Sequence, residues 1–219
     1  MAGETLGAAY EALIKCMLDT LAPTLPGSPQ VFWHVKPGAL TTIPDFSLGQ
    51  DPERPTHVIL VTHSGSLRNS DMKFWRNIGE VAEAKTRLQA SPRVVSVVFD
   101  STVKQGLKEL AQAVVDGQLT IGDKPYGDIV NAWVRALVSS LPRDADAKVV
   151  AIRDAARVAP ANVKGAWAEM EADVAVLLAQ ANVATDAIWR QERRRAPGRA
   201  PTARNTHVRR GVGKLLLLD

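Results

Sequence analysis

The chain has 219 residues, of which 46% are hydrophobic and 23% charged, and its formal net charge is +4. This length and balance are typical of a globular protein with one domain and an extension, or with two small domains, and they exclude a chain that is disordered throughout. The single cysteine, Cys16, excludes internal disulfides, and we interpret it as a small core residue of a reduced, cytoplasmic protein.

The sequence contains no segment that would target the chain to a membrane or anchor it there. The opening residues, Met1 to Leu6, lack a basic region followed by a long apolar run. The longest apolar run near the end, Leu215 to Leu218, is far shorter than the roughly 20 residues that span a bilayer. We therefore expect no membrane partner.

In the first half of the chain, side-chain patterns predict one helix followed by three strands. Apolar residues recur at steps of three and four over 6–21, which is typical of an amphipathic helix. Residues 30–35 are rich in β-branched and aromatic side chains, and 57–62 predict a strong buried strand. Between them, 41–48 predict a short strand that Pro44 interrupts, so we expect it at an edge or at a strand start.

A strand–helix–strand unit completes this half. We predict a helix over 69–89, with Asn69 or Ser70 as its cap and Asp71 in its first turn, where the helix dipole favours negative charge. A second buried strand follows over 93–99. Because a helix connects them, this strand and the one before the helix should be parallel.

The second half is alanine-rich and mainly helical. We expect no clear strand before 211–218, where a run of leucines predicts a buried strand. A core strand at the very end suggests that the chain is a fragment of a longer protein. The helices are predicted over 104–115, 126–141, 144–158 and 163–189.

These elements predict an α/β fold, with a small mixed β-sheet flanked by helices and a mainly helical C-terminal half. We expect three parts. They are an α/β core over 1–103, a helical part over 104–189, and a basic segment with the terminal strand over 190–219.

A carboxylate at a strand start is the first candidate for chemistry. Asp45 follows Pro44 there, which would hold its carboxylate at a fixed place off the sheet. Mg²⁺ prefers oxygen ligands and is often held by one or two carboxylates together with the substrate's phosphate. The alternative is a turn aspartate without a function.

The predicted helix over 69–89 offers a polar edge beside its apolar face. Lys73, Asn77 and Glu80 fall within a narrow arc at about 100° per residue. In a functional interpretation, Glu80 binds metal beside the strand carboxylate, and Lys73 assists the attacking water or stabilises charge on the phosphate. In the alternative, this is a solvated face on which Arg76 and Glu80 form an i,i+4 pair.

This order of elements resembles the PD-(D/E)xK nuclease core of type II restriction endonucleases. The likeness covers roughly Leu6 to Phe99 and comprises a helix, Pro44-Asp45 on a short strand, a buried strand, a helix with a carboxylate, and a further strand. The resemblance implies Mg²⁺ between Asp45 and a second acid. It also implies a role for Glu11, which matches a helix position where many family members have another metal-associated acid.

The chain departs from the family pattern at the end of the buried strand. The family usually has an acid, any residue and a lysine there, whereas this chain has Thr62-His63-Ser64. Some restriction enzymes instead have a Ser-x-Lys strand and a glutamate on the next helix. By that resemblance Thr62 matches the serine, Glu80 matches the displaced glutamate, and Lys73 replaces the lysine missing at Ser64.

Histidines and small polar residues give further candidates. His63 is a candidate to hold a water or contact phosphate, with a structural histidine as the alternative, and Ser64 and Asn77 are candidates beside it. We interpret His34 as a core or surface residue. The sequence has no cysteine–histidine spacing of a zinc site, no Gly-x-Ser-x-Gly elbow and no glycine-rich phosphate loop.

Basic residues concentrate near the end of the chain. Between Arg190 and Lys214, only Glu192 opposes them. Such a block attracts the phosphates of a nucleic acid, or is a solvated linker that binds nothing. Arginine suits both phosphates and guanine edges. The candidate DNA-binding residues are Arg68, Arg193, Arg194, Arg195, Arg199, Arg204, Arg209 and Arg210.

The leading hypothesis is a magnesium-dependent, sequence-specific endonuclease for double-stranded DNA. Its catalytic residues would be Asp45, Lys73 and Glu80, with Mg²⁺ on Asp45 and Glu80. Palindromic recognition sites imply a homodimer. One alternative is a catalytically inactive DNA-binding or assembly domain with the same fold. Another is an enzyme for a small phosphorylated substrate.

Overall fold

The computed structural model describes the backbone of residues 2–63, 67–88, 92–99, 109 and 112–195, and the side chains of 6–63, 76–88, 92–99, 109 and 112–179. The chain divides into two units, Met1–Ala184 and Thr185–Asp219. The fold described below is that of the first unit.

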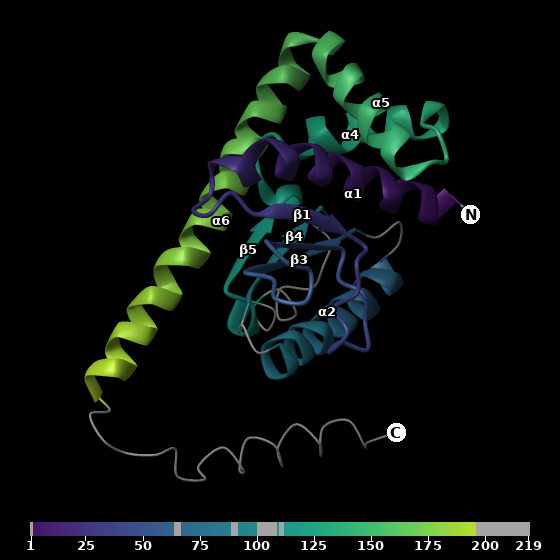
Figure 1. Cartoon of the computed structure of the whole chain (residues 1–219). Helices are drawn as coiled ribbons and strands as arrows, with labels where there is room; N and C mark the ends of the chain where they lie inside the picture. The colour runs from purple at the N-terminus through teal and green to yellow at the C-terminus, as the bar shows by residue number, and fades with distance from the viewer. Residues whose placement is uncertain (1, 64–66, 89–91, 100–108, 110–111, 196–219) are drawn as a thin grey trace. The chain divides into compact units, whose positions relative to one another are not determined.

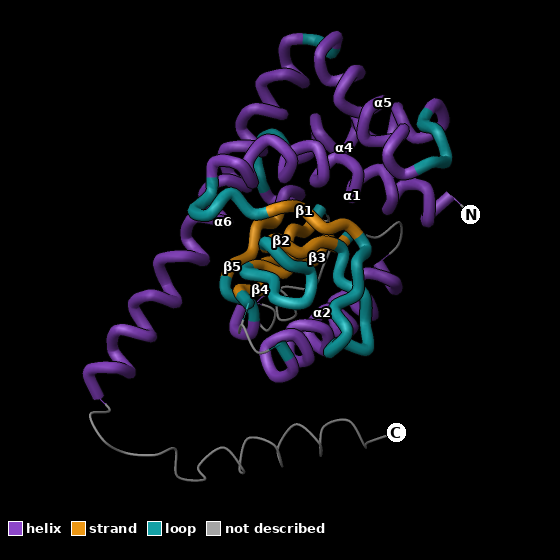
Figure 2. Tube along the Cα trace, viewed as in Figure 1, coloured by secondary structure: helices purple, strands orange, loops and turns teal. Residues whose placement is uncertain are grey.

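A five-stranded mixed sheet lies at the centre of this unit (Figure 2). The strands lie side by side in the order of the sequence. The β1–β2 and β2–β3 pairs are antiparallel, whereas β3–β4 and β4–β5 are parallel. The strands are β1 (Gln30–Trp33), β2 (Phe46–Gly49), β3 (His57–Thr62), β4 (Arg93–Val98) and β5 (Gly117–Thr120).

Helices cover both faces of the sheet. Figure 1 shows α1, α4 and α5 on one side and α2, which connects β3 to β4, on the other. Short 3-10 turns occupy Ala22–Thr24, Ile121–Asp123 and Val138–Ser140. The α-helices are α1 (Ala2–Leu21), α2 (Leu67–Arg87), α4 (Gly127–Leu137), α5 (Ala145–Val158) and α6 (Ala161–Arg195).

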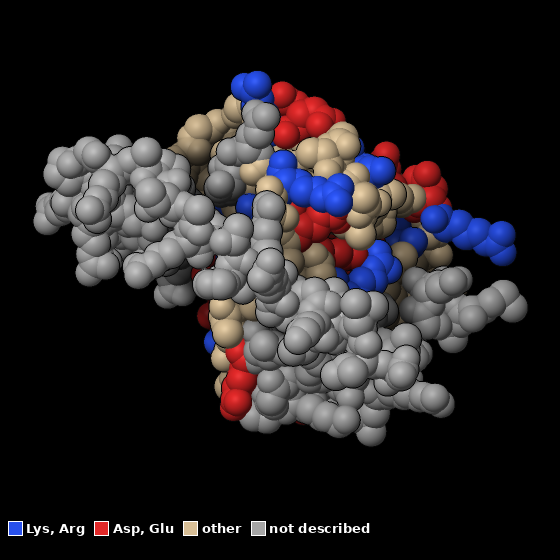
Figure 3. Space-filling view, turned by 90° about the horizontal axis from the view of Figure 1, so that it is seen from below, with Lys and Arg blue, Asp and Glu red and all other residues tan. Residues whose placement is uncertain are grey.

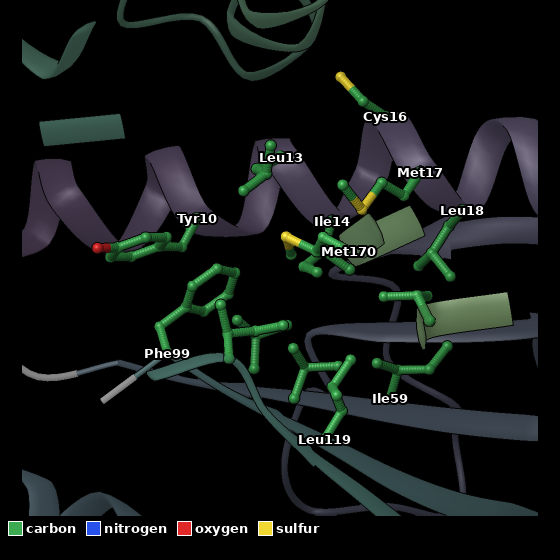
Figure 4. Close-up of a cluster of buried hydrophobic side chains, with 14 of the residues drawn as sticks. Tyr10, Leu13, Ile14, Cys16, Met17, Leu18, Ile59, Phe99, Leu119 and Met170 are labelled. Atoms are coloured by element: carbon green, nitrogen blue, oxygen red, sulfur yellow. The ribbon is translucent and has the colours of Figure 1, made fainter. Parts of the chain in front are cut away.

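The larger hydrophobic core lies between α1 and the sheet. Side chains of α1 such as Ile14 and Met17 point towards Ile59 of β3 and Leu119 of β5 (Figure 4). Burying one such aliphatic side chain contributes about 1.5–3 kcal/mol. The same core includes Val130 and Val134 of α4, Val149 and Ile152 of α5, and Met170 and Val174 of α6.

Cys16 lies on the opposite side of α1 from Ile14 and points away from the sheet (Figure 4). Its Sγ is 3.3 Å from the carbonyl oxygen of Val149 in α5. Burial raises the pKa of the thiol to about 11. The prediction of a small, buried core cysteine is confirmed.

A smaller core lies between α2 and the other face of the sheet. Because side chains alternate along a strand, Val58 and Leu60 of β3 face α2, while Ile59 and Val61 face the larger core. Val81 and Ala84 of α2 contribute to this second core. Together, the two cores explain the buried pattern of β3.

The predicted fold class is confirmed, as is the parallel strand–helix–strand unit. Several details differ. The strand predicted over 30–35 ends at Trp33, and that predicted over 41–48 begins only at Phe46 and ends at Gly49. The helix after β3 begins at Leu67, so Asn69 and Ser70 lie inside it rather than capping it. A strand, β5, occurs where only helices were expected.

The expected boundary at residue 103 does not separate two cores. Strand β5 extends the sheet beyond that point, and α4 and α5 share one core with α1. The predicted strand over 211–218 lies outside the described residues. None of the helices in the described part of the chain combines the length and hydrophobicity needed to cross a membrane.

Candidate metal centre

The candidate site lies where β1 ends, β2 begins and β3 ends. Antiparallel pairing brings these strand ends together, because Trp33 is opposite Phe46 and Phe46 is opposite Ile59. His34 follows β1 and Asp45 precedes β2. The amide of His34 donates a hydrogen bond to the carbonyl oxygen of Asp45 at 3.1 Å. The pairing thus continues one residue beyond the strands and sets His34 beside Asp45.

His34 has a left-handed backbone conformation, with φ of 51°. Few residues other than glycine adopt it, although histidine does so more often than most. The conformation turns the chain immediately after Trp33, which explains why β1 is shorter than predicted. A turn follows, in which the amide of Leu40 donates to the carbonyl oxygen of Pro37 at 3.0 Å.

Three potential metal ligands converge at this place. One ligand atom each from Glu11, His34 and Asp45 lies within 4.8 Å of the other two. Glu11 projects from α1, and its Oε2 is 3.0 Å from Nε2 of His34. The His34 side chain is 52% exposed and that of Glu11 is 19% exposed. The cluster is therefore open to solvent on the side of His34.

The electrostatic environment of Asp45 is unusual for a carboxylate. Burial, together with the negative charges of Glu11 and Glu80, raises its pKa from 3.8 to about 7, although the charge of His34 acts in the opposite direction. The amide of Val61 donates a hydrogen bond to Oδ2 of Asp45 at 2.6 Å, which also lowers the pKa. Several carboxylates thus repel one another here, and a bound cation would relieve that repulsion.

Glu80 lies close to this cluster but outside it. Its side chain is 9% exposed, and its Oε1 is 2.7 Å from Nε of Arg76. This is the i,i+4 pair considered as the alternative. Among the described residues, the set whose ligand atoms lie close enough to share one metal ion comprises Glu11, His34 and Asp45. Glu80 is nevertheless near enough to raise the pKa of Asp45, and its role as a metal ligand stays a prediction.

The other residues of the predicted polar edge are Lys73 and Asn77, both in α2. The Lys73 side chain and the whole of Ser64 lie outside the described residues. Nδ2 of Asn77 donates a hydrogen bond to Oγ1 of Thr62, at the end of β3. Asn77 therefore fixes α2 to the sheet.

His63 is buried against α1. Its side chain is 5% exposed, and its ring centroid is 5.4 Å from that of Tyr10. A Cβ atom on Gly7 would lie 2.3 Å from Nε2 of His63, so a glycine at position 7 is what allows α1 to approach the ring. These contacts favour a structural histidine.

A second carboxylate of α2 holds the loop that leads to Asp45. Thr41 donates hydrogen bonds from its amide and hydroxyl to Oε1 of Glu83 at 2.7 and 2.6 Å. Thr42 donates the same pair to Oε2 at 3.3 and 2.8 Å. Burial would raise the pKa of Glu83, but these hydrogen bonds lower it to about 2. We call this contact the Glu83 clamp.

The side chains expected to bind DNA are not described. Arg68 in α2 and Arg193, Arg194 and Arg195 in α6 have a described backbone only, whereas Arg199, Arg204, Arg209 and Arg210 lie outside the described residues. Among the described residues on the face in Figure 3, basic and acidic side chains lie next to one another. The DNA-binding role of these arginines stays a prediction.

The sequence pattern did not predict His34 as a ligand. The available signal was its position directly after one strand of an antiparallel pair, with Asp45 directly before the other. Such positions are neighbours once the pairing is known. Glu11, in contrast, was a candidate only through the family resemblance.

Comparison with protein-family models found no match, and comparisons with curated proteins and with solved structures found none either. The function is therefore argued from the geometry of the Glu11–His34–Asp45 cluster, together with the resemblance of the element order.

Proposed function

We propose that the protein is a metal-dependent endonuclease that hydrolyses phosphodiester bonds in double-stranded DNA. The convergence of Glu11, His34 and Asp45, with ligand atoms within 4.8 Å of one another, carries this proposal. Two carboxylates and an imidazole are donors that suit a divalent cation. Such a cation, when bound, polarises a phosphate and supplies a nucleophilic water at neutral pH.

The residues around the centre have separate roles in this proposal. Asp45 is the central ligand, because the amide of Val61 orients its carboxylate. Glu80 adds a second negative group near Asp45 and becomes a ligand if it leaves Arg76. Lys73, two turns before Glu80 on α2, assists the attacking water.

The partners follow from the same proposal. Arg68 and the arginines of the basic segment bind the phosphates of double-stranded DNA. The affinity of such contacts falls steeply as the salt concentration rises. Two-fold symmetric DNA sites call for a homodimer. A single thiol, at Cys16, suits a cytoplasmic location.

One observation favours a second candidate, a DNA-binding or assembly domain without catalysis. Glu80, the expected second acid, is paired with Arg76 at 2.7 Å. In the sequence, Thr62-His63-Ser64 also takes the place of the acid, any residue and lysine of the nuclease family. In this candidate, the basic segment binds DNA and no bond is cut.

Incubation with supercoiled plasmid and either Mg²⁺ or Mn²⁺ tests the proposal. We expect discrete cleavage products from the parent protein. Replacing a residue that only hydrogen-bonds to a metal ligand lowers activity by roughly 10- to 100-fold. Asp45→Asn and Glu11→Gln remove ligands themselves, so each should lower the cleavage rate by more than that. Glu169→Gln, which changes an exposed carboxylate of α6, is the matched control and should cut normally.

Two outcomes contradict the proposal. Equal cutting by Asp45→Asn and the parent protein would mean that the centre is not catalytic. A retarded plasmid band without any cleavage, in either metal, would favour the DNA-binding domain without catalysis.

A further inference from the structure

We propose that His34 makes the centre selective for a first-row transition-metal dication, from Mn²⁺ to Zn²⁺, over Mg²⁺. This inference rests on the metal site of the proposed function, but it does not depend on DNA cleavage. It differs from the expectation of a Mg²⁺ site made of Asp45 and Glu80 alone.

The donor set supports this selectivity. Mg²⁺ is a hard cation that prefers oxygen and keeps several waters, whereas imidazole nitrogen suits the later first-row metals. One of the three residues that could share a metal ion is a histidine, and its Nε2 is 3.0 Å from Oε2 of Glu11. A cation held by Glu11 and Asp45 would therefore meet an imidazole nitrogen at the same place.

The charges and the openness of the cluster also fit a dication. Glu11 and Asp45 would contribute two negative charges when ionised, which a single imidazolium balances only in part. With His34 neutral and acting as a ligand, a dication balances both carboxylates. Three protein ligands leave coordination positions for water and for a substrate oxygen. The 52% exposure of the His34 side chain provides access from solvent.

The competing explanation is that His34 is only the ion-pair partner of Glu11. The two explanations differ in what the imidazole does when metal is added. As a ligand, its nitrogen is bonded to the metal. As an ion-pair partner, it has no bond to the metal, and replacing it changes the affinity for Mn²⁺ and Mg²⁺ to the same small extent.

The test compares Mn²⁺ and Mg²⁺ binding by calorimetry in the parent protein and in His34→Asn. Asparagine tolerates the left-handed backbone at this position and replaces the ring nitrogen by an amide oxygen. We expect the parent to bind Mn²⁺ at least about tenfold more tightly than Mg²⁺, and the variant to lose about tenfold or more of its Mn²⁺ affinity. The affinity for Mg²⁺ should change much less. Glu169→Gln should bind both metals as the parent does.

Pulsed electron paramagnetic resonance of bound Mn²⁺ gives a second readout. The parent should show a ¹⁴N coupling from a directly bound imidazole, and His34→Asn should lack it. Equal affinity for the two metals, or Mn²⁺ without nitrogen coupling, would overturn the inference and leave the endonuclease proposal open to its own test. Nitrogen-coupled Mn²⁺ in a protein that cuts no DNA would support the inference and count against the endonuclease.

Discussion

The amide of Val61 donates a hydrogen bond to Oδ2 of Asp45 at 2.6 Å, which places the end of β3 against the first residue before β2. The contact holds a partly buried carboxylate next to Glu11 and His34. It offsets only part of the cost of burying this charge, because the pKa of Asp45 is still raised to about 7. Without a metal, the charge of Asp45 therefore lowers the stability of the folded protein. Four predictions concern this site and the elements that surround it.

The first prediction concerns Asp45→Asn and the pH dependence of stability. Since the pKa of Asp45 is raised from 3.8 to about 7, the folded protein keeps a proton that the unfolded chain releases between these values. The free energy of unfolding should therefore fall as pH rises from 3.8 to 7, by up to about 1.4 kcal/mol per pH unit from this group. Asparagine keeps an acceptor for the Val61 amide but cannot ionise.

We accordingly expect Asp45→Asn to be more stable than the parent above pH 7 and similar to it near pH 4. Urea denaturation in the presence of a chelator, at several pH values, measures the difference. Parallel pH profiles for the two proteins would show that Asp45 does not titrate abnormally.

The second prediction concerns the Glu83 clamp. Glu83→Gln replaces one acceptor oxygen by a donor, so hydrogen bonds from Thr41 or Thr42 are lost, at a cost of about 1–3 kcal/mol at pH 7. Because the folded-state pKa of Glu83 is lowered to about 2, its contribution is complete above the ordinary value of 4.5 and is lost as pH falls from there towards 2. The difference between parent and variant should shrink over that range.

The same variant should bind Mn²⁺ more weakly, because the clamp fixes the loop that leads to Asp45. Glu169→Gln, at an exposed site in α6, controls for the loss of one charge. If Glu83→Gln unfolds at the same urea concentration as the parent at pH 7, the clamp contributes no stability.

The third prediction uses two glycines in helices. Gly7→Ala places a Cβ 2.3 Å from Nε2 of the buried His63, which should cost about 1–3 kcal/mol through overpacking. Gly165→Ala in α6 meets no atom within 4 Å and should stabilise the protein by up to about 1 kcal/mol, because alanine favours helices. The midpoint of thermal unfolding should therefore fall in Gly7→Ala and rise in Gly165→Ala, relative to the parent. If Gly7→Ala unfolded at the same midpoint as the parent, α1 would be able to move away from His63.

The fourth prediction concerns metal and stability. A cation that binds only the folded protein should stabilise it by about 2.7 kcal/mol at a concentration 100 times the dissociation constant. Mn²⁺ should therefore raise the unfolding midpoint of the parent and leave that of Asp45→Asn unchanged. A chelator should reverse the shift. An identical shift in both proteins would indicate binding elsewhere.

Much of the fold could be predicted from the sequence, because its signals are local. The β3 strand and the helix of α1 have strong apolar patterns. The strand has the predicted bounds, and the helix ends at Leu21 as predicted but begins at Ala2 rather than at Leu6. In contrast, β5 has only four residues, of which one, Leu119, is buried, so its identity depends on pairing with β4. The start of α2 at Leu67 likewise could not be predicted, because Asn69 and Ser70, which resemble helix-capping residues, lie inside the helix.

The candidate site was less accessible to prediction, because its residues meet only through tertiary contacts. Asp45 could be identified from its proline and strand, and Glu11 from the family resemblance. His34 required knowledge of the β1–β2 pairing, and the Glu83 clamp requires contacts between a loop and α2. A polar residue at a strand end is common, and only its neighbours in space make it a ligand candidate.

A crystal of the parent protein soaked in Mn²⁺ tests the central claim most directly. Anomalous diffraction would locate the metal independently of any activity. We predict a peak within coordination distance of Glu11, His34 and Asp45. Strong Mn²⁺ peaks elsewhere, with none at this cluster, would contradict the claim that these three residues form a metal centre.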